Sequence, residues 1–144
     1  MNFLLAGVIA VGLLAVAILH FMWACGSTFP AADEKTLAVT VAGFRGVQKM
    51  PPRLASLIVS AALLFCVLLP LGLVFQNIAG GWLLKLLAGF IGAVFVLRGV
   101  MGFTPWWRSL TPEQPFARLD RKYYSPFCLF VGISLFVLTA RVLT

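Results

Sequence analysis

Residues 3–25 read FLLAGVIAVGLLAVAILHFMWAC, a run of 23 residues without Asp, Glu, Lys or Arg. A helix rises about 1.5 Å per residue, so this run is about 35 Å long and exceeds the ~30 Å hydrocarbon core of a bilayer. Three further apolar runs follow, at residues 54–75, 82–103 and 126–143. The four runs predict four membrane-spanning helices in a single transmembrane domain of residues 1–144.

The composition points to the same class of protein. The chain is 62% hydrophobic and 10% charged, with a mean hydropathy of +1.05, whereas soluble domains carry about 25% charged residues. The predicted fold class is therefore an all-α integral membrane four-helix bundle. No basic residue precedes the first apolar run, which is also longer than the apolar part of a signal peptide. We therefore expect this run to be a retained span.

The charges predict an orientation. Most of them lie at residues 33–53 and 108–122, which four spans place on one side, whereas both termini and the short turn at 76–81 share the other side. The loop side carries eight Lys or Arg residues and the other side one, with a further lysine just inside the third span. The positive-inside rule then predicts cytoplasmic loops in a bacterial inner membrane, N-out and C-out. The net charge of +7 comes mainly from basic residues that flank the spans, so we expect membrane lipids and no nucleic acid as partners.

Two residues near the end of the first span are functional candidates. His20 is the only histidine, and Trp23 lies three residues later on the same helix face. An ionisable side chain at this depth is a candidate by default, and histidine titrates near neutral pH, as a general acid or base must. The alternative, in which a neutral His20 bonds to a neighbouring helix or to the interface, remains open.

Arg98 and the segment at residues 116–128, FARLDRKYYSPFC, form a second group of candidates. An arginine within a span needs an acid, a phosphate or water, so Arg98 either has such a partner or extends to the headgroups. Asp120 is a candidate partner for Arg98, Arg118 or Arg121. The expected helix start at Ser125 and the basic residues before it favour an anion such as a lipid phosphate. Ordinary interfacial residues would give the same pattern.

These candidates together predict a cytoplasm-facing polar pocket that binds a lipid or an amphipathic small molecule. The predicted catalytic residues are His20 and Asp120, and the predicted ligand-binding residues are Trp23, Arg98, Arg118, Arg121, Tyr124 and Ser125. Whether the protein is an enzyme remains open. A single histidine and three widely spaced cysteines give no metal signature, and no cofactor is predicted.

A structural or accessory role is the main alternative. Gly92 and Gly99 share one face of the third span, and small residues allow helices to approach closely in lipid. This face would pack in a homo-oligomer or against a larger membrane protein. A transporter is favoured less, because the spans contain no Asp or Glu for a proton relay.

Three elements of the sequence together resemble a known family. They are HFMWACG at residues 20–26, Arg98 followed by Gly99, and the segment at 116–128 with its aspartate and its YSPFC sequence. The chain resembles a family of small bacterial membrane proteins known as a domain of unknown function. The resemblance covers nearly the whole chain and implies about four spans, with an H-F-x-W-A-x-G element ending the first. It implies no reaction.

Overall fold

The computed structural model describes residues 2–75 and 81–141, and all regular secondary structure in these ranges is helical. The elements are α1 (Asn2–Ala24), α2 (Glu34–Val41), α3 (Arg53–Val74), α4 (Gly81–Met101), α5 (Pro105–Leu110), α6 (Phe116–Leu119), the π-helical turn η1 (Asp120–Tyr124) and α7 (Ser125–Arg141). Except for Gly81, which begins α4, the predicted turn at 76–81 lies outside the described residues.

Four helices are long and apolar enough to cross a membrane: Asn2–Ala24, Arg53–Val74, Gly81–Met101 and Phe116–Ala140. This finding confirms the predicted all-α, four-helix fold.

The last of these helices begins earlier than the sequence suggested. Ser125 does not cap a new helix, because α6, η1 and α7 run without a break. The Ser125 N–H bonds to the Asp120 carbonyl oxygen, five residues back rather than four. Such a wide turn relieves the clash that the Pro126 ring would make with the carbonyl group four residues before it.

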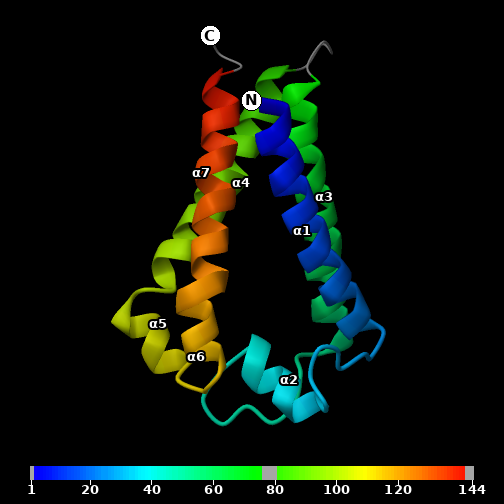
Figure 1. Ribbon diagram of the computed structural model, residues 1–144, viewed down its shortest axis with the longest axis vertical. Coiled ribbons are helices and arrows are strands. Elements are labelled where there is room, and N and C mark those ends of the chain that lie inside the picture. The colour runs from blue at the N-terminus through cyan, green and yellow to red at the C-terminus, as the bar shows by residue number, and fades with distance from the viewer. Residues whose placement is uncertain (1, 76–80, 142–144) are drawn as a thin grey trace.

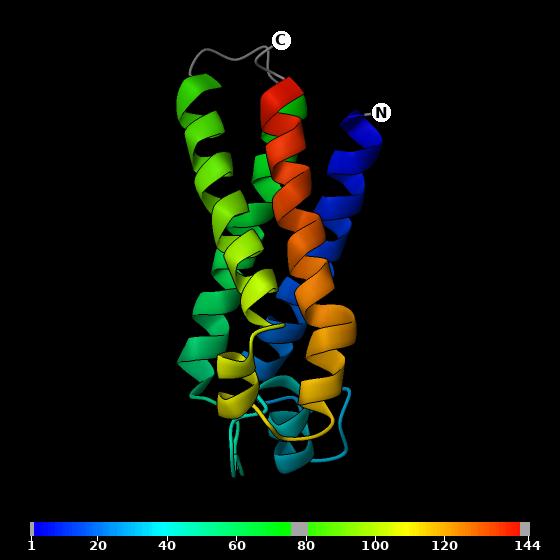
Figure 2. The ribbon, with the colours of Figure 1, turned by 90° about the vertical axis from the view of Figure 1, so that its left-hand side faces the viewer.

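The four long helices form two antiparallel pairs, α1 with α3 and α4 with α7 (Figures 1 and 2). In the first pair, the buried Ser60 hydroxyl donates to the Ala17 carbonyl oxygen at 2.9 Å. In the second pair, Gly92 faces Gly132, where an added Cβ would lie 2.6 Å from the Gly92 oxygen. Gly99 contacts Leu129 in the same way. The glycine face of α4 is therefore packed against α7 of the same chain.

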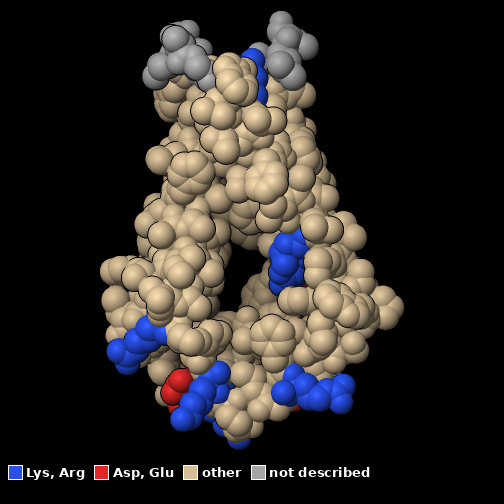
Figure 3. All heavy atoms as spheres, turned by 180° about the vertical axis from the view of Figure 1, so that it is seen from behind, with Lys and Arg blue, Asp and Glu red and all other residues tan. Residues whose placement is uncertain are grey.

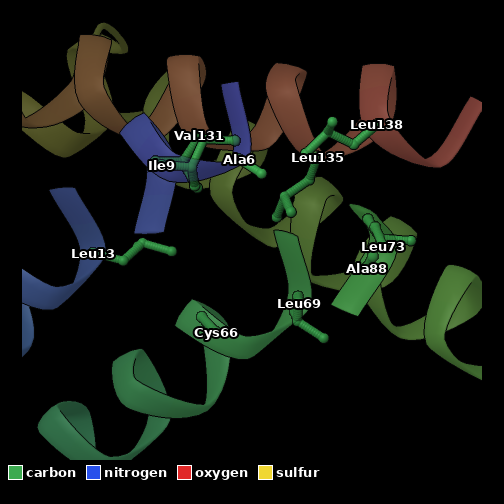
Figure 4. Close-up of a cluster of buried hydrophobic side chains, with 10 residues drawn as sticks. All are labelled: Ala6, Ile9, Leu13, Cys66, Leu69, Leu73, Ala88, Val131, Leu135 and Leu138. Carbon is green, nitrogen blue, oxygen red and sulfur yellow. The ribbon is translucent and has the colours of Figure 1, made fainter. Parts of the chain in front are cut away.

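The two pairs meet at the end of the molecule where α1 begins and α7 ends, which we call the terminal end (Figure 1). A cluster of buried side chains from all four helices fills this end (Figure 4): Ala6, Ile9, Leu13, Cys66, Leu69, Leu73, Ala88, Val131, Leu135 and Leu138. Towards the middle of the molecule, the Phe127 ring of α7 packs against Gly12 of α1.

At the opposite end, which we call the loop end, the helix pairs diverge. A space-filling view shows an opening between them and basic side chains gathered below it (Figure 3). The segment from α2 onwards crosses this end to the other pair. The Tyr124 hydroxyl donates to the Thr40 carbonyl oxygen at 3.3 Å, and the Phe116 side chain lies against Gly43, where φ is +64°. A side chain at Gly43 would overlap that ring, so glycine is required on both counts.

Candidate functional site

Asp120 is the centre of the polar contacts at the loop end. It is 0% exposed and begins the π-helical turn. Its Oδ1 accepts hydrogen bonds from Arg98 Nη2 at 2.8 Å and from Ser125 Oγ at 3.1 Å. Its Oδ2 accepts from Arg108 Nη2 at 2.8 Å and from Trp107 Nε1 at 3.0 Å. We call these five residues the Asp120 cluster.

Local structure brings the members of the cluster together. Gly102, just after α4, approaches Ser125 so closely that a Cβ there would overlap the hydroxyl. The Gly102 carbonyl oxygen accepts from Arg108 Nε at 2.8 Å, and Arg108 Nη1 donates to the Ala117 carbonyl oxygen. One guanidinium group thus joins the end of α4 and α6 to the Asp120 carboxylate.

The geometry of the cluster favours a role in holding helices together. An ionised carboxylate offers about four lone-pair sites, and the Asp120 carboxylate receives four donors. Two arginines against one carboxylate leave a net charge of +1. The Arg98 side chain remains 32% exposed, and its guanidinium carbon lies 4.9 Å from the centre of the Trp107 ring. Positive charge therefore remains on the partly exposed Arg98, next to a carboxylate whose acceptor positions are all used.

The sequence identified part of this cluster. Arg98 was one of three expected partners of Asp120, and among the described residues Arg118 and Arg121 form no ion pair with it. Sequence reasoning missed Arg108 and Trp107. The short helix α5 directs both side chains towards the Asp120 carboxylate. The sequence does not indicate that direction. Closeness in sequence to Asp120 was the only available signal.

His20 and Trp23 lie on the other helix pair, with ring centres 4.7 Å apart. His20 Nδ1 is 2.9 Å from the Val16 carbonyl oxygen, and Trp23 Nε1 donates to the Phe29 carbonyl oxygen at 2.7 Å. Both rings line a pocket of about 130 Å³ together with residues of α2 and α3. No member of the Asp120 cluster lines this pocket, so the structure places the predicted polar residues in separate sites.

Arg118 and Arg121 line another pocket, of about 440 Å³, which we call the basic pocket. Its lining residues are Arg108, Gln114, Ala117, Arg118, Arg121 and Lys122. Tyr124 lies elsewhere, with its ring centre 5.9 Å from that of Phe116 and its hydroxyl directed to α2. Within residues 2–75 and 81–141, no three His, Cys, Asp or Glu side chains lie close enough together to hold a metal ion.

Four helices of membrane-spanning length and a polar loop end define the class, a small helical membrane protein with four spans. A comparison with family models goes one step further. The chain belongs to the family described as "Protein of unknown function (DUF3995)", whose model matches residues 13–135. This range includes the elements at 20–26 and 116–128, and it confirms the family resemblance seen in the sequence. No curated protein and no solved structure matches the chain.

Proposed function

We propose that this protein is a bacterial inner-membrane protein that binds the phosphate of an anionic lipid headgroup in the basic pocket. The observation that carries the proposal is the lining of that pocket, which has four cationic side chains and no acid. Arg108 is already paired with Asp120. The charge available to a ligand therefore comes from Arg118, Arg121 and Lys122, all of them exposed.

The chemistry of these side chains suits a phosphate. A guanidinium group presents paired N–H donors that match two phosphate oxygens. Arg118 and Arg121 follow each other on the α6–η1 turn, at the loop end of the last span. A headgroup at this level would keep its acyl chains alongside the helices.

A role in setting topology alone requires basic charge on the loop side but no particular placement. A phosphate-binding site and a topology signal can be distinguished by removing the same amount of charge at two different places. We compare two double variants. The first combines Arg118→Gln and Arg121→Gln, and the second combines Lys35→Gln and Lys49→Gln. The second pair is also exposed and loop-side, and neither lysine lines the basic pocket.

Native mass spectrometry of the protein with equimolar phosphatidylglycerol and phosphatidylcholine measures the outcome. Each basic residue near anionic lipid contributes about 1 kcal/mol, so the arginine double variant should bind phosphatidylglycerol roughly 30-fold more weakly. The lysine double variant should bind like the unmodified protein. Equal losses in both variants would show a diffuse charge effect and no built site.

The proposal also places the loop end in the cytoplasm. Cys25 follows α1 at this end and is exposed, whereas Cys66 is buried in the terminal-end cluster and Cys128 is partly buried within the last membrane-spanning helix. A membrane-impermeant maleimide should therefore label Cys25 in inverted membrane vesicles and leave it unlabelled in intact spheroplasts. Cys25→Ser should abolish the labelling. Labelling in spheroplasts would reverse the predicted orientation.

A further inference from the structure

The pocket beside His20 is a second site, and none of its lining residues lines the basic pocket. We call it the α1–α3 pocket, because it lies between the end of α1, the end of α2 and the first turns of α3. Its polar lining comes from His20, Trp23 and Ser56, and the remaining lining residues are Val41, Ala42, Met50, Pro51, Ala55 and Val59. None of these residues is charged at neutral pH if His20 is neutral. The lining suits an uncharged molecule.

Ser56 distinguishes this pocket from a simple apolar gap. The residue is 6% exposed, yet within the part of the chain that the structure describes its hydroxyl makes no hydrogen bond. Ser60, one turn further along α3, is 1% exposed and donates to the Ala17 carbonyl oxygen. Buried polar groups nearly always have a partner, and a buried hydroxyl without one is costly. The Ser56 hydroxyl therefore has an unused donor and acceptor at the pocket wall.

His20 supplies a complementary group. A carbonyl oxygen can only accept, so the 2.9 Å contact with Val16 requires the proton on Nδ1. In the neutral ring Nε2 is then an acceptor. A ligand hydroxyl can donate to His20 Nε2 and accept from Ser56. A carbonyl group would satisfy Ser56 alone, and an anion would meet no cation in the lining.

We infer that the α1–α3 pocket binds the hydroxyl group of an uncharged molecule whose apolar body is about the size of a benzene ring. The size follows from the volume of about 130 Å³, because an apolar cavity of about 150 Å³ in another protein holds benzene. The wall of valine, methionine and proline side chains covers the apolar body. The Trp23 ring, 4.7 Å from the His20 ring, holds the imidazole in place.

The single histidine provides a direct test with phenol as the probe. When the protein is labelled with ¹⁵N-histidine and placed in phosphatidylcholine nanodiscs, its NMR spectrum shows side-chain resonances from the two ring nitrogens of His20 alone. Phenol at pH 7 should move the Nε2 resonance along a saturable curve, because its hydroxyl donates to this nitrogen. Benzene, which has no hydroxyl, should leave the resonance in place. A phenol shift that rises linearly without saturation would mean partition into the bilayer and would overturn the proposal.

Matched serine variants test the pocket itself. Ser56→Ala removes the unused hydroxyl and should weaken phenol binding about tenfold without loss of folding. Ser60→Ala, one turn away, and Ser134→Ala, a buried serine of α7, should bind phenol like the unmodified protein. Ala55→Leu should fill the pocket and abolish saturable binding. Equal phenol affinity in Ser56→Ala and the two control variants would overturn the assignment.

Discussion

Asp120→Asn is expected to lower the free energy of unfolding by about 3 kcal/mol, the largest effect of a single substitution that we predict. The change removes the negative charge of the carboxylate, whose two oxygens lie 2.8 Å from Arg98 Nη2 and 2.8 Å from Arg108 Nη2. Breaking a buried ion pair costs about 3–5 kcal/mol, since the remaining charge is left unpaired. The two arginines are 32% and 24% exposed, so water compensates part of the loss. Reversible unfolding in mixed micelles measures the difference.

Two further variants make this experiment specific. Asp33→Asn changes an exposed acid that caps α2 through the Thr36 N–H at 2.8 Å, and asparagine caps a helix as well as aspartate does. Its expected effect is within about 0.5 kcal/mol. Adding Arg98→Met to Asp120→Asn should recover part of the stability, because one unpaired charge is removed. If Asp120→Asn costs no more than Asp33→Asn, the cluster does not hold the helices together.

Gly132→Ala should destabilise the α4–α7 pair by about 2 kcal/mol. The added Cβ would lie 2.6 Å from the Gly92 carbonyl oxygen and 2.8 Å from the Val96 nitrogen. Both are backbone atoms, so a side-chain rotation cannot relieve the contact and the helices must move apart. The same unfolding measurement in micelles detects the loss.

Gly89→Ala on α4 is the matched control. An added Cβ there meets nothing within 4 Å, and alanine favours a helix over glycine by up to about 1 kcal/mol. The variant should be as stable as the unmodified protein or slightly more stable. Similar losses at Gly89 and Gly132 would mean that close contact with α7 is not what requires the glycine.

The four long helices could be predicted because the thickness of a bilayer fixes how many apolar residues a span needs. The first three helices begin and end within two residues of the predicted spans. The last one differs because its start depends on a π-helical turn at Asp120–Tyr124. That turn lies in a polar stretch, where hydropathy carries no signal for a helix.

The candidate site could be predicted only in part, because sequence gives the depth of a residue more readily than its direction. His20 and Arg98 each lie about one turn from the loop end of their helices. The pairing of α1 with α3 and of α4 with α7 then assigns them to different pairs. Which face of a helix meets its neighbour depends on contacts such as Gly92 with Gly132, and one sequence of uniformly apolar helices does not reveal them.

The crossing of the loop end by α2 has a consequence for the order of events during synthesis. The Thr40 carbonyl group is made early, and the Tyr124 hydroxyl that bonds to it is 84 residues further along the chain. Phe116, which lies against Gly43, is equally late. A ribosome must therefore deliver almost the whole polypeptide before α2 can reach its final neighbours. Until then, the loop end of the first two spans lacks these contacts with the second helix pair.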